Sequence, residues 1–268
     1  MGEGRRHRLH CNDELLQTVY DLSHYHITII SDDDDDIWTN VIKDAQTFAS
    51  SRITGHTEPG YISPFEKSER PDIIYCNDGT VMGIECFKFD ASKKVRGGSA
   101  QERKESQISI SHIREYQQED SDMRPLSYKT SIDPDYSMSH YTSSFLNTFN
   151  NHAEKIADYR DHIKHQFPDK EVLITFFVED ITSLGCYMRT SKGIEPVYPF
   201  RIVEILDALN KHIGSLDYIV IKYQKSPHIH NIIVQKVCDQ QLDQLYKQRY
   251  GPNDTFIPYN YSVISDFV

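Results

Sequence analysis

The sequence predicts a single three-layer α/β domain. Two strand-like runs, PDIIYC (71–76) and VMGIECFKF (81–89), flank an Asp-Gly step, which is a strong hairpin signal between such runs. After the hairpin, amphipathic helices alternate with strand-like runs, an order typical of helices layered on a sheet. A chain of 268 residues suits one large domain with its own core. We therefore expect one domain over 1–268, with its core over about 35–225.

Before the hairpin, the pattern predicts two helices and one strand. CNDELLQTVYDL (11–22) is typical of a short helix, and HITII (26–30) is a β-branched run typical of a strand. The aspartate run at 32–36 then precedes a helix, because acidic side chains favour a helix N-terminus. Apolar residues recur in that helix at helical spacing: Ile37, Trp38, Val41, Ile42, Ala45 and Phe48.

After the hairpin, the polar, serine-rich stretch at about 91–142 has few apolar anchors, so we expect an insertion or lid there. A long helix is predicted over about 143–166, with one stripe formed by Phe145, Phe149, His152, Ile156, Tyr159 and Ile163. The later elements are expected to be a buried strand (172–178), a helix (199–212), two strands (217–223 and 228–234) and a last helix (239–248).

The composition favours a cytoplasmic protein without a membrane partner. No run of about 18 apolar residues is present, as a transmembrane helix would require. The basic N-terminus lacks the apolar region of a secretory signal. The five cysteines are scattered without Cys-x-x-Cys spacing, which is typical of reduced thiols in a reducing compartment.

Charge is distributed unevenly along the chain. The net charge of −11 predicts a surface that, as a whole, repels nucleic acid. A basic segment nevertheless follows the second hairpin strand and contains Lys93, Lys94, Arg96, Arg103 and Lys104. These side chains are candidates for contacting substrate phosphates. The alternative is a solvated loop, because charge runs usually belong to solvated faces.

The hairpin places two carboxylates side by side. If Asp78-Gly79 is a two-residue turn, counting outward sets Asp72 opposite Glu85 as a non-hydrogen-bonded pair. The β-carbons of such a pair approach to about 4.5–5.5 Å, and two like charges there need compensation. A hard cation such as Mg²⁺ suits two carboxylates. A shared proton or a nearby Lys or Arg would also compensate, and in a different register both acids would face solvent.

A short motif surrounds these acids. Pro71-Asp72 is followed by the turn and then by Gly83-Ile84-Glu85-Cys86-Phe87-Lys88. This arrangement resembles the PD-(D/E)xK, or restriction-endonuclease-like, nuclease superfamily, which has Asp on one strand and Glu-x-Lys on the next. The order of a helix before the motif and a helix and strand after it is similar over about 35–180. The resemblance implies a restriction-endonuclease-like core with a central mixed sheet flanked by helices.

The motif departs from the family pattern at its lysine. Glu-x-Lys would put lysine at position 87, which is Phe87. Lys88 comes one residue later, and in a regular strand it points away from Glu85 and opposes Glu69. Only a β-bulge would turn Lys88 back toward the carboxylates.

A lysine from the following helix is the preferred substitute, since some members of the superfamily have their lysine displaced onto a helix. Lys155 lies one turn before Tyr159, so both can line one edge of that helix. The alternative is a solvent-exposed lysine beside acidic neighbours. Asp44 is a candidate for the additional acid that the family often carries on its early helix. Glu179, at the end of a buried strand, could border the same site; the alternative is an exit residue, since strand ends often carry acids.

The resemblance implies a metal-dependent nuclease that hydrolyses phosphodiester bonds of DNA. Asp72, Glu85 and the Cys86 carbonyl would bind Mg²⁺ or Mn²⁺, and the metal would activate water. Lys155 or Lys88 would orient that water or stabilise the transition state. The alternative is a nuclease-like fold that has lost catalysis and serves as a binding or assembly module. A third hypothesis, which applies if the hairpin is misread, is an unrelated α/β interaction protein. DNA versus RNA, and self-association into a homo-oligomer, stay open.

Overall fold

A computed structural model describes most of the chain. The described residues are 14–30, 37–54, 63–91, 94–95, 98–118, 126–132, 137–182, 186–226, 229–258 and 261–267. The aspartate run at 32–36, Lys93 and Arg96 lie outside these ranges, as do the side chains of Lys94 and Arg103.

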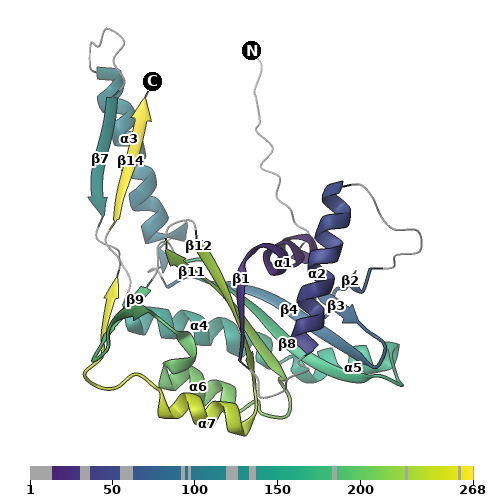
Figure 1. Cartoon of the computed structure of the whole chain (residues 1–268). Helices are drawn as coiled ribbons and strands as arrows, with labels where there is room; N and C mark the ends of the chain where they lie inside the picture. The colour runs from purple at the N-terminus through teal and green to yellow at the C-terminus, as the bar shows by residue number, and fades with distance from the viewer. Residues whose placement is uncertain are drawn as a thin grey trace.

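Seven strands form a large mixed sheet in the order β1-β12-β11-β8-β4-β3-β2 (Figure 1). Strands β2, β3 and β4 form an antiparallel meander, and β8 and β11 continue parallel to β4. Strand β12 returns antiparallel to β11, and β1 lies parallel to β12. The bounds are β1 (His26–Ile30), β2 (Phe65–Lys67), β3 (Ile73–Cys76), β4 (Thr80–Phe89), β8 (Glu171–Asp180), β11 (Tyr218–Ser226) and β12 (Ile229–Lys236). The sheet therefore extends beyond the core expected over 35–225.

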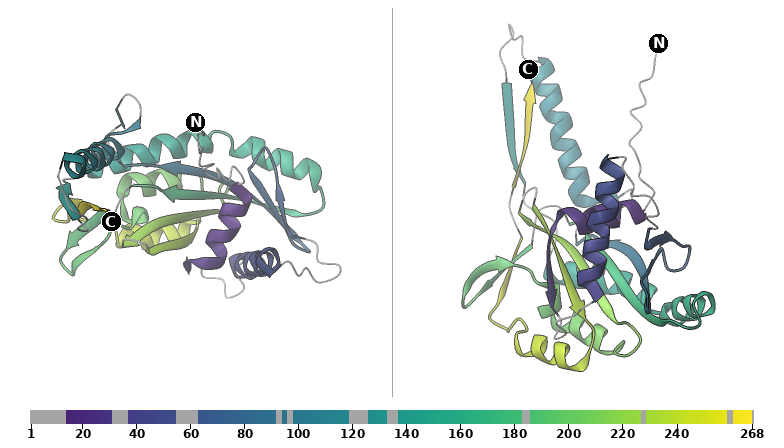
Figure 2. Two further views of the ribbon diagram at one scale, coloured as in Figure 1. Left: turned by 90° about the horizontal axis from the view of Figure 1, so that it is seen from above. Right: turned by 45° about the vertical axis from the view of Figure 1, so that its right-hand side comes forward.

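Helices cover both faces of the sheet, consistent with the predicted three-layer α/β class (Figure 2). One face packs against α1 (Glu14–His24) and α2 (Ile37–Thr54). The other face packs against α4 (Met138–Ala153), α5 (Ile156–Gln166), α6 (Val203–Asn210) and α7 (Asp239–Lys247).

Side chains of the hairpin alternate between these two layers, as the pleat of a strand requires. The side chains that pack with the α1/α2 layer are Ile73, Tyr75, Met82 and Ile84. Those that pack with the α4/α5 layer are Ile74, Val81, Phe87 and Phe89. By this alternation Glu85 faces α4 and α5, whereas Lys88 faces α1 and α2.

The long helix expected over 143–166 is two helices, and this expectation was wrong in its continuity. At the junction, the Lys155 N–H donates to the His152 carbonyl over 3.0 Å, a tight turn of the 3₁₀ kind. Phe145 and Phe149 before the break, and Ile156 and Ile163 after it, are all buried against the sheet. The apolar stripe therefore continues across a change in helix geometry.

The insertion expected at about 91–142 forms, with the last strand, a structure that we call the arm. It carries β5 (Lys94–Val95), β6 (Gly98–Ser99), α3 (Ala100–Gln118) and β7 (Leu126–Ile132). Strand β7 pairs antiparallel with β14 (Tyr261–Phe267). Buried His112 of α3 joins both strands, with Nδ1 2.9 Å from Ser265 Oγ and Nε2 2.8 Å from Thr130 Oγ1. The arm projects away from the sheet (Figure 1 and the right view of Figure 2).

A separate sheet of three strands is formed after β8. It contains β9 (Cys186–Thr190), β10 (Gly193–Pro196) and β13 (Thr255–Pro258). The helix expected over 199–212 begins as a 3₁₀ turn, Pro199–Arg201, and continues as α6. None of the helices in the described ranges combines the length and apolarity that a membrane crossing requires.

Candidate functional site

The hairpin register that the turn predicts is confirmed. Ile73 pairs with Ile84 and Cys76 pairs with Val81, so Asp78-Gly79 occupies the turn. The Asn77 N–H donates to the Thr80 carbonyl over 3.1 Å and closes it. Asp72 directly precedes β3, and the same register therefore sets it opposite Glu85.

Asp72 is bound to the neighbouring strand beside Glu85. Its Oδ2 accepts a hydrogen bond from the Cys86 N–H over 2.7 Å, and its carbonyl accepts one from the Ser68 N–H over 2.9 Å. The first bond holds the Asp72 carboxylate against β4, next to Glu85, and the second fixes the backbone of Asp72.

Glu85 is only 7% exposed and is bound from the helical layer above it. Its Oε1 accepts a hydrogen bond from the Tyr159 hydroxyl over 2.7 Å and lies 2.7 Å from His152 Nδ1. Burial, then the hydrogen bond and charge of Glu85, and then the charge of Asp72, raise the pKa of Tyr159 well above its usual range. Both carboxylates therefore act on the same phenol. The exposed Arg70 acts in the opposite sense on that pKa.

Phe87, at the position where the family pattern has lysine, packs flat against His152. The two rings lie 4.5 Å apart between centroids, with an angle of 12° between their planes. Sequence reasoning placed His152 on the apolar stripe and did not identify it as a site residue. The signal was present, because a titratable ring on a buried stripe, two turns before Tyr159, must find a polar partner.

The other predicted site residues divide between solvent and the opposite face of the sheet. Lys155 is exposed at the turn between α4 and α5. Asp44 accepts a 2.8 Å hydrogen bond from the Tyr75 hydroxyl, in the α1/α2 layer. Of the basic segment, Lys104 is exposed on α3. The sheet therefore separates Asp44 from Asp72 and Glu85.

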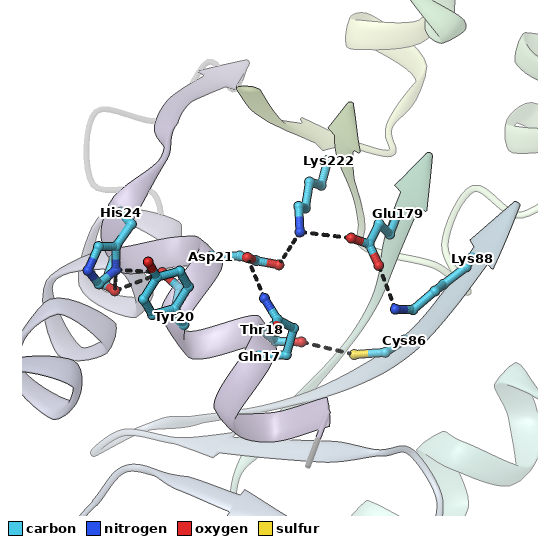
Figure 3. A network of polar contacts seen from close by, with 10 residues as sticks. Gln17, Thr18, Tyr20, Asp21, His24, Cys86, Lys88, Glu179 and Lys222 are labelled. Carbon is cyan, nitrogen blue, oxygen red and sulfur yellow. Dashed lines mark hydrogen bonds and ion pairs between the residues drawn. The ribbon is translucent and has the colours of Figure 1, made fainter. Parts of the chain in front are cut away.

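Lys88 and Glu179 belong to a second group of charges behind the sheet, shown in Figure 3. Lys88 Nζ lies 2.7 Å from Glu179 Oε2, because the two residues are direct partners in the parallel β4/β8 register. The expected opposition of Lys88 to Glu69 was wrong. The ladder between β3 and β4 stops at the Ile73–Ile84 pair, whereas β8 pairs with β4 along its whole length and gives Lys88 its direct partner, Glu179.

A buried lysine links this group to α1. Lys222 Nζ lies 2.8 Å from Asp21 Oδ2 and 2.8 Å from Glu179 Oε1, and its side chain is 6% exposed (Figure 3). Burial tends to raise the pKa of Glu179, but the hydrogen bonds from Lys222 and Lys88 outweigh it and lower that pKa. Two carboxylates and two ammonium groups are thus paired, and we call these four residues the ionic cluster.

A small cavity of about 60 Å³ adjoins the ionic cluster between α1 and the sheet. Gln17, Thr18 and Cys86 are among its lining residues, and the Cys86 thiol lies 3.5 Å from the Thr18 hydroxyl. Because the charges beside this cavity compensate one another, the ionic cluster is suited to hold α1 on the sheet. Within this cluster Lys88 is paired with Glu179, on the face of the sheet opposite to Glu85.

A further carboxylate, which is half-buried, lies where β8 ends. Asp180 Oδ1 accepts the Thr182 N–H over 2.9 Å. Burial raises the pKa of Asp180 to about 6; hydrogen bonds from Thr182 and Tyr141 lower it, and the charge of Asp90 raises it. The carboxyl of Asp180 therefore keeps its proton to a higher pH in the folded chain than in the unfolded chain.

This shift predicts a pH dependence of stability. Since the pKa of Asp180 is higher in the folded chain than the ordinary 3.8, its contribution to stability is complete below about pH 4 and is lost as the pH rises through about 6. We expect Asp180→Asn to remove on the order of 2 kcal/mol of pH-dependent change in unfolding free energy across this window. Urea unfolding of both proteins between pH 4 and 7 checks this, and parallel pH profiles would contradict it.

Comparisons with known proteins leave the site to be judged on its own geometry. No family model matches the chain, and neither a curated protein nor a solved structure matches it. Among the described residues, no group of three or more His, Cys, Asp and Glu side chains is arranged to hold a metal ion.

Proposed function

We propose that this protein is a metal-dependent nuclease that hydrolyses phosphodiester bonds of DNA, with Asp72 and Glu85 as its acidic pair. The observation that carries the proposal is the confirmed hairpin register, which brings the two acids to one face and to one phenol, Tyr159. Two like charges held this closely favour a cation between them.

The order of the elements supports a restriction-endonuclease-like core. Helix α2 precedes the antiparallel strands β2, β3 and β4, helices α4 and α5 follow, and β8 then lies parallel to β4. This is the order that the resemblance of the motif implies. The acids lie on the two central strands of this unit, β4 and the approach to β3.

The donor set fits Mg²⁺ or Mn²⁺ better than a metal that needs three side chains. Magnesium is commonly held by one or two carboxylates, with waters and substrate phosphates completing its shell. Asp72, Glu85 and the Cys86 carbonyl would hold the ion. Both hydrogen bonds to Glu85 fall on Oε1, which leaves Oε2 without one inside the described ranges. The bound ion would activate water and neutralise charge on the phosphate.

The reaction is hydrolysis. A water oxygen bonds to phosphorus while the bond from phosphorus to the leaving sugar oxygen breaks. One proton of the water is released to solvent, and the leaving oxygen takes up a proton, so that a phosphomonoester and a free hydroxyl end are produced. Burial of Glu85 beneath α4 and α5 keeps the attacked region partly shielded from bulk water.

Cleavage assays with acid-to-amide variants test the proposal. We expect purified protein to cut plasmid or labelled oligonucleotide DNA with Mg²⁺ or Mn²⁺ and not with EDTA. Asp72→Asn and Glu85→Gln should each lower the rate by at least about 10²-fold, while Glu66→Gln, an exposed acid on β2, should leave it unchanged. Absence of cleavage with both metals on DNA and RNA would refute the proposal.

A second candidate function is a nuclease-like module that binds or assembles without catalysis. It is favoured by two observations: Lys88 is ion-paired with Glu179 on the far face, and Phe87 fills the lysine position. This alternative predicts DNA or protein binding that survives in the Asp72→Asn/Glu85→Gln double variant, with no cleavage by either protein.

A further inference from the structure

The imidazole of His152 lies where the motif lacks its lysine. Phe87 fills the lysine position, and the ring of His152 is stacked on it at a centroid distance of 4.5 Å. The same imidazole is 2.7 Å from Glu85 through Nδ1. The imidazole of His152, on α4, is therefore held beside Glu85 by Phe87, the residue at the lysine position.

The hydrogen bond to Glu85 decides how the imidazole is oriented. The Glu85 carboxylate accepts a hydrogen bond, so in the neutral ring Nδ1 carries the hydrogen and Nε2 carries a lone pair. Nε2 makes no hydrogen bond within the described residues and is not among their buried unpartnered atoms. With the side chain 21% exposed, Nε2 is the edge of the ring open to an incoming molecule.

We propose that His152 does the work of the missing lysine by orienting the attacking water through Nε2. This inference rests on the proposed nuclease function and assigns a residue to it. Nε2 accepts a hydrogen bond from the water, which turns an oxygen lone pair of that water toward phosphorus. Lys155 lies exposed on the helix junction and Lys88 is bound to Glu179, so His152 is the nitrogen group seated at Glu85.

The His152→Asn substitution tests the role of Nε2 alone, because it can keep the hydrogen bond to Glu85. The asparagine amide can donate to Glu85 as Nδ1 does, but it carries nothing at the place of Nε2. We expect His152→Asn to lower the cleavage rate by about 10²-fold while the hydrogen bond to Glu85 is kept. His165→Asn, at an exposed histidine on α5, is the matched control and should cleave normally. A His152→Asn protein with the wild-type rate would overturn the proposal.

Two measurements without substrate turnover give independent readouts. Nitrogen NMR of the metal-free protein should show His152 with its hydrogen on Nδ1, and a hydrogen on Nε2 of the neutral ring would contradict the proposal. Calorimetric titration with Mn²⁺ should give similar affinities for the wild type and His152→Asn, and much weaker binding for Glu85→Gln. A loss of Mn²⁺ affinity in His152→Asn as large as that in Glu85→Gln would make His152 a ligand instead and overturn the assignment.

Restoring the lysine is the decisive experiment. Phe87→Lys in the His152→Asn background should recover at least about 10-fold of the lost rate, since it returns the motif to Glu-x-Lys. Failure of a folded double variant to recover any rate would count against His152 as the replacement. Phe87 is 7% exposed, so thermal unfolding must first show that the double variant folds. If it does not fold, the asparagine and NMR results decide.

The two proposals fail in different ways. If the wild type cleaves and Asp72→Asn and Glu85→Gln do not, but His152→Asn cleaves normally, only the role of His152 is wrong. If the wild type cleaves nothing with Mg²⁺ or Mn²⁺, the nuclease function and the role of His152 are overturned together.

Discussion

Replacing Lys222 by methionine is expected to lower the free energy of unfolding by about 3–5 kcal/mol, measured by urea denaturation at pH 7. The Lys222 side chain is 6% exposed and pairs with Asp21 and Glu179. Methionine keeps much of the volume of the side chain but removes the ammonium group. Asp21 is then left buried without its cation, and among the described residues Glu179 retains its ion pair with Lys88.

Two further variants separate lost charge pairing from lost packing. Lys88→Met removes the same charge from a side chain that is 59% exposed, so we expect a loss of about 0–1 kcal/mol. Adding Asp21→Asn and Glu179→Gln to Lys222→Met should restore most of the stability, because no uncompensated buried charge is left. If Lys222→Met and Lys88→Met proved equally mild, the ionic cluster would not anchor α1.

Replacing Phe176 by alanine should lower the free energy of unfolding by about 3–5 kcal/mol. Phe176 is fully buried on β8, directly opposite Glu85 in the register. Its ring contacts Phe87, Phe149 and His152, with centroid distances of 5.4, 5.6 and 6.4 Å. Removing it opens a cavity beneath the site, where β4 and α4 meet.

The same variant should also disturb the chemistry proposed for the site. The cavity lets Phe87 and His152 shift, so the cleavage rate should fall together with stability. Phe176→Leu, which fills much of the space, should lose less of both. Equal stability of the alanine and leucine variants would show that the site does not depend on this ring.

The hairpin was predictable because its geometry is local. A two-residue turn fixes every pair up to Asp72 and Glu85, and nothing distant in the sequence can change that count. The apolar stripe of α4 was predictable for the same reason, since helical spacing alone places Phe145 and Phe149 on one side, whereas the break before α5 was not visible in that spacing.

The partners of the charged residues were not predictable, because they come from distant strands. Lys88 meets Glu179 only through the parallel pairing of β4 with β8, and Lys222 meets Asp21 across 201 residues of sequence. Asp44 could be placed on its helix but not on a face of the sheet. His152 was visible on the stripe, yet its contact with Glu85 depends on how α4 lies across β4.

The arm has a consequence for the order in which the protein assembles during synthesis. Strand β7 finds its partner in β14, which leaves the ribosome roughly 130 residues later. Until then, His112 of α3 lacks its partner Ser265, which lies on β14. The main sheet, whose last strand ends at Lys236, can close before the arm has all its parts. The arm is therefore expected to be the last unit to fold on the nascent chain, and its exposed β7 edge is open to a neighbouring nascent chain in the meantime.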